Sequence, residues 1–233
     1  MAFGNAIKKS NITENWLFDF YNQDSYLSFD GSNDYIDCGK TTDASPVSVA
    51  VSGTFAFWIN FPTLVDGQIE EIWFNNNYND NYSGVWIYKS GDHKIICSTM
   101  DNTGTGVGNR ESFTSGTVLE ANTWYFIVIG TNFNHATATV NDNWHIYINN
   151  DKSGNVTNDG SGNHNAPTYD PNSGKCYFGR EITGTDAYGK FKMKNFAVWK
   201  TFLSPTNITA AYNSGKYTNI ADIDSDELVA YWQ

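Results

Sequence analysis

Two polar stretches of the chain gather residue types that bind sugars. Residues 75–82 read NNNYNDNY and residues 101–109 read DNTGTGVGN. Amide and carboxylate groups hydrogen-bond to sugar hydroxyls, and an aromatic ring packs against the C–H surface of a sugar ring. Ordinary turn chemistry, which favours Asn, Asp and Gly, is the alternative for each single residue. The sequence predicts a ligand site at Asn77, Tyr78, Asp80, Tyr82, Asp101, Asn102 and Asn109.

The same stretches contain the candidate metal ligands. The carboxylates of Asp80 and Asp101, together with carbonyl groups of their loops, have the oxygen chemistry that Ca²⁺ prefers. Calcium is therefore the candidate cofactor, and the metal content stays open. No zinc site is predicted, because the four histidines are scattered and no HExxH or Cys/His grouping occurs.

The carboxylate pair of a glycoside hydrolase is not evident in the sequence. Such enzymes place two carboxylates around the scissile bond. Glu70 and Glu71 are adjacent, so a strand would turn them to opposite faces. Residues 222–227, DIDSDE, are typical of a solvated turn, and no GxSxG nucleophile motif occurs. The sequence predicts a protein that is not an enzyme. A polysaccharide hydrolase whose site is built from distant loops stays an alternative.

Charge and hydropathy exclude several classes of partner. The 233-residue chain has a formal net charge of −11, which repels DNA and argues against nucleic acid as a ligand. Residues 1–15, MAFGNAIKKSNITEN, lack the apolar segment of a secretory signal. No apolar run approaches the length that spans a membrane. We therefore expect cytoplasmic synthesis without a signal peptide, and no membrane insertion.

Cysteines and most tryptophans are expected in the interior. Cys38, Cys97 and Cys176 are far apart and odd in number, which predicts neither a disulfide framework nor a metal site. Each lies among apolar residues, so we expect buried, reduced thiols on strands. Six tryptophans fall in strand patterns and are expected in the core rather than on a ligand platform: Trp58, Trp73, Trp86, Trp124, Trp144 and Trp199.

Beyond residue 25, apolar alternation with a period of two predicts a succession of strands. Phe55, Phe57, Ile59 and Phe61 would share one strand face. Near the start, residues 26–29 and 35–38 flank Asp30-Gly31, which predicts a strand, a tight turn and a second strand. Further strands are expected at residues 71–74, 84–88, 93–99, 124–130, 144–149, 175–180, 191–199 and 228–232.

One helix is expected near the C-terminus. Ser204 has the side chain of an N-cap, Pro205 suits the first helical position, and Gly215 suits the end of the helix. Ile208, Ala211 and Tyr212 would line its buried face.

Residues 1–25 read differently from the rest. Their aromatic run is apolar at nearly every position and needs cover on both faces. We interpret it as an arm that docks on another protein, and a first strand in the core of the domain is the alternative. The candidate anchoring residues are Trp16, Leu17, Phe18, Phe20 and Tyr21.

Six short motifs follow one another between residues 26 and 213. They are FDGSNDYI at 29–36, FAFWI at 55–59, NTWY at 122–125, IYINN at 146–150, YFGR at 177–180, and a strand at 191–199 followed by LSP at 203–205 and AY at 211–212. Their order resembles the laminin-G-like domains of the concanavalin A-like lectin/glucanase superfamily, including the opening hairpin of those domains. Asn150 stands where the family usually has a turn glycine, and Asn tolerates the left-handed conformation needed there.

The resemblance implies an all-β fold, a two-sheet antiparallel jelly-roll sandwich. With the helix expected near the C-terminus, residues 26–233 would form this domain and residues 1–25 an arm or first strand. The fold hosts lectins, adhesion modules, glycanases and virion proteins, so it does not imply one activity.

Residues 8–18 also resemble the leader of some tailed-phage virion proteins. The resulting hypothesis is a non-enzymatic bacteriophage structural, appendage or decoration protein at the virion surface. Its residues 1–25 would contact other virion or assembly proteins, and its loops would bind host-surface glycans. A free carbohydrate-binding lectin is the alternative, and homo-oligomerisation stays open.

Overall fold

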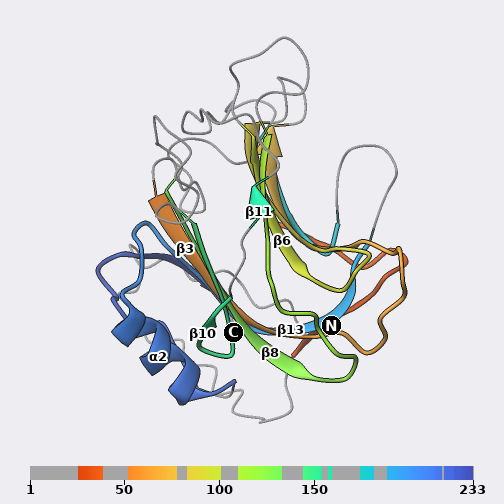
Figure 1. Cartoon of the computed structure of the whole chain (residues 1–233). Helices are drawn as coiled ribbons and strands as arrows, with labels where there is room; N and C mark the ends of the chain where they lie inside the picture. Colours follow the sequence, from red (N-terminus) through yellow and green to blue (C-terminus); the bar gives the residue numbers. More distant parts are fainter. Residues whose placement is uncertain are drawn as a thin grey trace.

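Two antiparallel β-sheets packed face to face form most of the chain that the structure describes (Figure 1). The computed structural model describes residues 26–38, 52–77, 83–100, 110–132, 144–153, 157–158, 174–180, 188–216 and 218–232. The expected all-β, two-sheet antiparallel sandwich with a short helix near the C-terminus is confirmed over these residues. Among them, no helix is long and apolar enough to cross a membrane.

The first sheet has seven strands, and β13 pairs with three of the others. The apolar run that starts at Trp124 lies in the middle of this sheet, where both of its faces are covered. The strand order is β1 (Leu27–Asp30), β13 (Lys190–Trp199), β3 (Ser52–Asn60), β8 (Trp124–Asn132), β9 (Trp144–Ile148) and β10 (Asp151–Lys152), with β14 (Leu228–Trp232) also paired to β13.

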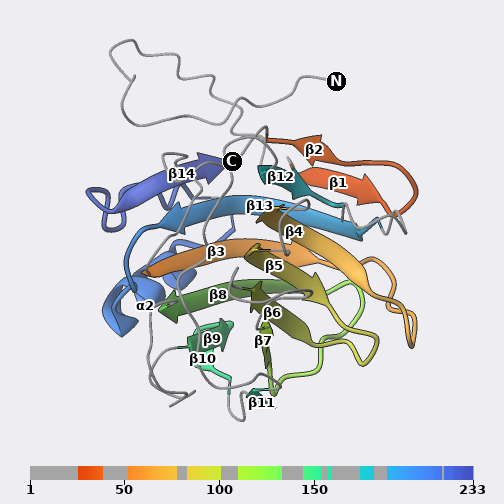
Figure 2. The same ribbon diagram turned by 90° about the horizontal axis from the view of Figure 1, so that it is seen from above.

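The second sheet also has seven strands, and Figure 2 shows its central strands lying over those of the first sheet. All of its pairings are antiparallel. The strand order is β11 (Thr157–Asn158), β7 (Arg110–Thr114), β6 (Ile95–Met100), β5 (Ser83–Lys89), β4 (Glu70–Asn77), β12 (Gly174–Phe178) and β2 (Ile36–Asp37).

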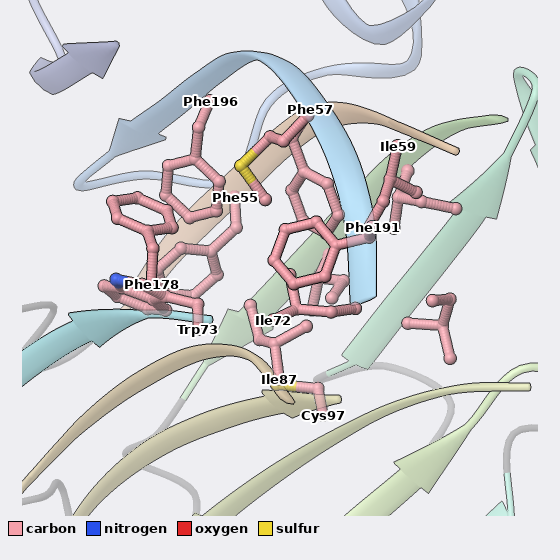
Figure 3. Packing of buried hydrophobic residues seen from close by; sticks show 14 of the residues in the cluster. Phe55, Phe57, Ile59, Ile72, Trp73, Ile87, Cys97, Phe178, Phe191 and Phe196 are labelled. Carbon is pink, nitrogen blue, oxygen red and sulfur yellow. The ribbon is translucent and has the colours of Figure 1, made fainter. Parts of the chain in front are cut away.

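The main core fills the space between the sheets (Figure 3). Phe55, Phe57 and Ile59 all point inward from β3, as their spacing predicts, and all are fully buried. Across the core, the ring of Phe55 lies 4.7 Å from that of Trp73 in β4. Each fully buried side chain of this size contributes about 1.5–3 kcal/mol through the hydrophobic effect. Period-two burial therefore holds the sandwich together.

The other face of the first sheet is covered by α2 (Pro205–Ser214). The Ser204 side chain accepts a hydrogen bond from the backbone N–H of Asn207, and Pro205 opens the helix, as predicted. Ile208 and Ala211 are buried against the sheet, and the ring of Tyr212 stacks on Trp58 at 5.9 Å. The first sheet is thus covered on both faces by described residues.

The opening motif does not form the hairpin that the resemblance implied. Residues on either side of the DGSND turn enter different sheets: β1 pairs with β13 and β2 pairs with β12. The Asp30 carboxylate accepts hydrogen bonds from the backbone N–H groups of Ser32 and Asn33, which fixes a corner. Gly31 has φ +78, and a Cβ there would lie 2.8 Å from the Cβ of Lys190. The corner carries the chain from one layer to the other.

The turn after β9 confirms the expected role of Asn150. Asn149 and Asn150 have φ values of +52 and +70, in the left-handed region. The side chain of Asn149 also accepts a hydrogen bond from the backbone N–H of Phe126, at 2.9 Å. Asparagine therefore supplies both the backbone conformation and a tie to β8.

Candidate ligand-binding face

The loops predicted to bind ligand begin and end side by side, at one end of the second sheet. Asn77 at the end of β4 pairs with Ser83 of β5 and Gly174 of β12. Met100 at the end of β6 pairs with Arg110 of β7. Because β4 and β6 run in the same direction, residues 78–82 and 101–109 connect strands at the same end of the sheet.

The side chains of that predicted site are outside the part of the chain that the structure describes. Asn77 belongs to a described strand, and Tyr78, Asp80, Tyr82, Asp101, Asn102 and Asn109 do not. The same holds for the candidate anchoring residues Trp16, Leu17, Phe18, Phe20 and Tyr21. Both sets, and calcium at Asp80 and Asp101, stay predictions. Within the described ranges, no group of three His, Cys, Asp or Glu side chains could hold a metal ion.

The outer side of the second sheet carries a connected set of aromatic and polar side chains, here called the aromatic face. Val85 and Ile87 of β5 point into the core, so Trp86 and Tyr88 point outward. Their ring centroids are 4.4 Å apart. The aromatic face consists of Glu71, Trp86, Tyr88, Ser98, Ser112 and Tyr177, with Tyr35, Arg180 and Tyr188 at its β2–β12 edge.

Trp86 corrects one expectation, because it lies on the aromatic face and is half-buried rather than in the core. Its indole N–H donates to the carboxylate of Glu71, which fixes the orientation of the ring. Across the β5–β6 pairing, Ser98 lies directly opposite Trp86, and its hydroxyl is 2.7 Å from that of Ser112. Glu71, Tyr88, Ser98, Ser112 and Tyr177 are all buried. The accessible part of the face is therefore the half-buried Trp86 and the edge residues Tyr35, Arg180 and Tyr188.

Arg180 lies among three tyrosine rings at the edge of the face. Its guanidinium carbon is 5.0 Å from the ring centroid of Tyr35, 5.7 Å from that of Tyr188 and 5.9 Å from that of Tyr177. Cation–π attraction at such distances holds a positive charge against the aromatic rings. Tyr35 is 43% exposed, so a ligand can reach its ring.

Tyr177 connects this edge to the rest of the face. It pairs with Asp37 of β2, and its ring meets that of Tyr35 edge to face at 5.8 Å. Burial, together with the nearby Asp37 carboxylate, raises the pKa of Tyr177, while Arg180 acts in the opposite direction. The phenol therefore stays protonated at neutral pH and can donate a hydrogen bond.

The two adjacent glutamates of β4 do not form a hydrolytic pair. Glu71 pairs with Tyr88 and lies on the aromatic face, whereas Glu70 pairs with Lys89 and points to the inner side. Burial raises the pKa of Glu70. The hydrogen bond that the backbone N–H of Lys190 donates to its carboxylate and the positive charge of Lys89 oppose this shift. This geometry agrees with their adjacent spacing in the sequence.

The acidic string near the C-terminus forms a turn, as predicted. Residues 221–227 are in turns between α2 and β14. The backbone N–H of Glu227 donates to the carbonyl of Asp224, and the Glu227 carboxylate lies 3.7 Å from the ammonium group of Lys200. These contacts give the string a structural role.

The family can now be assigned. A model of the concanavalin A-like lectin/glucanase superfamily matches residues 30–209, which is most of the chain. The chain belongs to this superfamily. No curated protein sequence matches it, so the relatives of this superfamily member come from solved structures.

Several solved lectin-like structures share the fold of this superfamily member at low sequence identity. The binding domain of botulinum neurotoxin DC, solved with rat synaptotagmin II, aligns with a TM-score of 0.59 and 16% identity over 93% of this chain and 46% of that chain. Botulinum neurotoxin type C, whose cell entry depends on two ganglioside molecules, aligns with a TM-score of 0.58 and 14% identity, covering 91% of this chain and 45% of that one.

A heptameric SAP-like pentraxin from Limulus polyphemus aligns with a TM-score of 0.55 and 12% identity, covering 83% of this chain and 84% of that one. This superfamily member thus spans under half the length of the neurotoxin chains. At these identities the alignments establish a shared sandwich architecture.

Proposed function

We propose that this chain is a non-catalytic glycan-binding module whose ligand contacts the accessible β2–β12 edge of the aromatic face. The observation that carries the proposal is the exposed ring of Tyr35 beside the guanidinium group of Arg180, with the half-buried Trp86 on the same sheet face. An aromatic ring packs on the C–H surface of a sugar, and the guanidinium group of Arg180 and the hydroxyl group of Tyr35 would bind its hydroxyls.

The predicted loops begin at the opposite end of the strands from Arg180, so they would extend the site along the aromatic face. Residues 78–82 lie between Asn77 and Ser83, and residues 101–109 lie between Met100 and Arg110, at one end of the second sheet. Their Asn, Asp and Tyr residues would add polar contacts at this end of the face, and Asp80 and Asp101 would hold calcium. Rigid strands position both parts of the site, as binding loops on a stable scaffold require.

A glycan array of the purified protein tests the proposal. We expect binding to a restricted set of glycans, and loss of that binding in Trp86→Ala. Loss in EDTA with recovery on added Ca²⁺ would support the calcium site, whereas unchanged binding in EDTA would contradict it. No binding to any glycan would contradict the proposed function, and release of reducing sugar from a polysaccharide would favour the hydrolase.

The finer hypothesis places this module on a bacteriophage virion, attached through residues 1–25. The supporting features are the aromatic run of that segment and the resemblance of residues 8–18 to the leader of some tailed-phage virion proteins. A chain lacking residues 1–25 would keep glycan binding and lose co-sedimentation with assembled particles. If the shortened chain still co-sedimented, the attachment hypothesis would be wrong.

A further inference from the structure

Two cysteines that are far apart in sequence lie directly opposite each other at the edge of the second sheet. The β2–β12 register pairs Ile36 with Phe178 and Asp37 with Tyr177, so the next pair is Cys38 with Cys176. The pairing continues to this position, because the backbone N–H of Cys38 donates to the carbonyl of Cys176 at 2.8 Å. Sequence spacing could not reveal this, since it predicted only isolated thiols.

The geometry of this pair suits a disulfide. Opposite residues of a hydrogen-bonded antiparallel pair have Cα atoms about 5.5 Å apart, and disulfides span Cα distances of about 4.4–6.8 Å. Both side chains are on the inner side of the sheet, where Cys38 packs against the core cluster that contains Cys176. The Cys38 thiol is also within hydrogen-bonding reach of the Cys176 thiol.

The third cysteine cannot compete for either partner. Cys97 belongs to the same core, but β6 is separated from β12 by β4 and β5. Three strand spacings correspond to about 14 Å, well beyond the reach of a disulfide. Both Cys38 and Cys176 are free thiols here, so the pair is in its reduced form.

The two thiols differ in their access to solvent. Cys176 is fully buried, and burial raises the pKa of its thiol, with the Cys38 side chain adding to the shift. Cys38 is half-buried and follows β2, the edge strand of the sheet. An oxidant would therefore meet Cys38 first, and Cys176 would act as the resolving thiol.

We propose that Cys38 and Cys176 form a redox modification site that a small-molecule disulfide, such as glutathione disulfide, oxidises to an intramolecular disulfide. The Cys38 thiolate attacks one sulfur of the small disulfide, forming a mixed disulfide and releasing one small thiol. Cys176 then attacks the Cys38 sulfur, and its proton passes to the departing small thiolate, which leaves as the second small thiol. Two protein thiols are oxidised and one small disulfide is reduced to two thiols.

The disulfide would fix one edge of the aromatic face. Among the described residues, β2 has two strand residues and pairs with one strand, β12. A covalent link one residue away from Asp37 would hold that edge in place. This consequence for ligand binding rests on the proposed function, whereas formation of the disulfide does not.

The test oxidises the full chain in a series of glutathione redox buffers, followed by alkylation in denaturant and mass spectrometry. We expect the oxidised protein to be lighter by two hydrogens. It should yield a peptide pair that links Cys38 to Cys176, with Cys97 alkylated. The Cys97→Ala variant should behave like the wild type. Cys38→Ser and Cys176→Ala should each abolish the mass loss. If Cys176→Ala fails to fold, Cys38→Ser still tests the proposal, because it leaves the buried Cys176 in place.

Thermal unfolding gives a second readout. A cross-link that closes a loop of about 140 residues restricts the unfolded chain, so the oxidised protein should melt at least about 5 °C higher until dithiothreitol is added. A persistent glutathione adduct on Cys38, a dimer linked through Cys38, or no oxidation at all would each overturn the proposal. Disulfide formation without glycan binding would leave it intact and contradict the proposed function alone.

Discussion

Glu70 and Glu71 are adjacent in β4, and their carboxylates lie on opposite sides of the second sheet. Glu71 accepts the indole N–H of Trp86 on the aromatic face, and Glu70 lies beside Lys89 on the inner side. Both Glu70 and Lys89 are buried, and the ammonium group of Lys89 donates to the carbonyl of Gln68 at 2.8 Å. Of these two neighbouring residues, Glu71 therefore orients the ring of Trp86, whereas Glu70 belongs to a buried charge pair.

The buried pair should behave as a unit in a double-mutant cycle. Burial lowers the pKa of Lys89 and raises that of Glu70, so each charge is costly to bury and depends on the other. We expect Glu70→Gln and Lys89→Met each to lower the free energy of unfolding by about 3 kcal/mol, because each leaves one buried charge uncompensated. The double variant should be close to the wild type in urea unfolding. Additive losses would contradict this coupling.

The turn at Asp30 should stabilise the protein in a pH-dependent way. Hydrogen bonds from the backbone of Ser32 and Asn33 lower the pKa of the exposed Asp30 carboxyl below its ordinary value of 3.8. Its folded pKa is lower than its unfolded pKa, so its contribution is complete above that ordinary value and is lost as pH falls through the folded pKa. Asp30→Ala should therefore be less stable than the wild type at pH 7.

Urea unfolding of Asp30→Ala and the wild type at pH 7, 4 and 2.5 measures this effect. The difference in stability between the two proteins should shrink as the pH falls. A difference that stays constant over this range would mean that the ionised carboxylate does not hold the corner.

Tyr35 and Tyr26 offer a matched comparison for ligand binding. Their exposures are 43% and 45%, and each ring faces a cation, Arg180 at 5.0 Å and Lys192 at 4.6 Å. Tyr35 is on the aromatic face and Tyr26 precedes a strand of the first sheet. Tyr35→Ala should weaken binding of the best array glycan about three- to tenfold by calorimetry, whereas Tyr26→Ala should not. Equal effects of both changes would argue against the aromatic face.

Gly189 allows the backbone to approach closely where β13 begins next to β4. A Cβ at this position would lie 2.1 Å from the carbonyl oxygen of Glu71 and 2.6 Å from the ring of Phe191. We expect Gly189→Ala to lower the free energy of unfolding by about 1–3 kcal/mol through overpacking. Gly67→Ala is the control, because a Cβ there meets no atom within 4 Å although φ is +76. We expect Gly67→Ala to lower the free energy of unfolding by less than Gly189→Ala in denaturant unfolding. That result would show that crowding, rather than backbone strain, causes the larger loss.

The elements of this fold could be predicted from the sequence because their signals are local. Alternation placed Phe55, Phe57 and Ile59 on one face, and Ser204 with Pro205 marked the start of the helix. Asn150 could be assigned a left-handed turn for the same reason. Each of these preferences depends on the residue itself and on neighbours a few positions away.

The candidate site was harder to predict because its residues come from separate strands. The alternation of residues 84–88 places Trp86 and Tyr88 on one face of a strand. It does not show whether that face points into the core or outward. Arg180 reaches Tyr35 and Tyr188 only because β12 pairs with β2 and an isolated bridge joins residues 180 and 188.

The sequence by itself determined the strands, the helix and the turns, since backbone conformation follows from short-range sterics, capping and apolar periodicity. Only the tertiary structure decided that the DGSND corner joins two sheets and that Cys38 meets Cys176. Those relationships depend on the register between strands that are distant in sequence. Register is set by the packing of the whole core, which no short stretch of residues encodes.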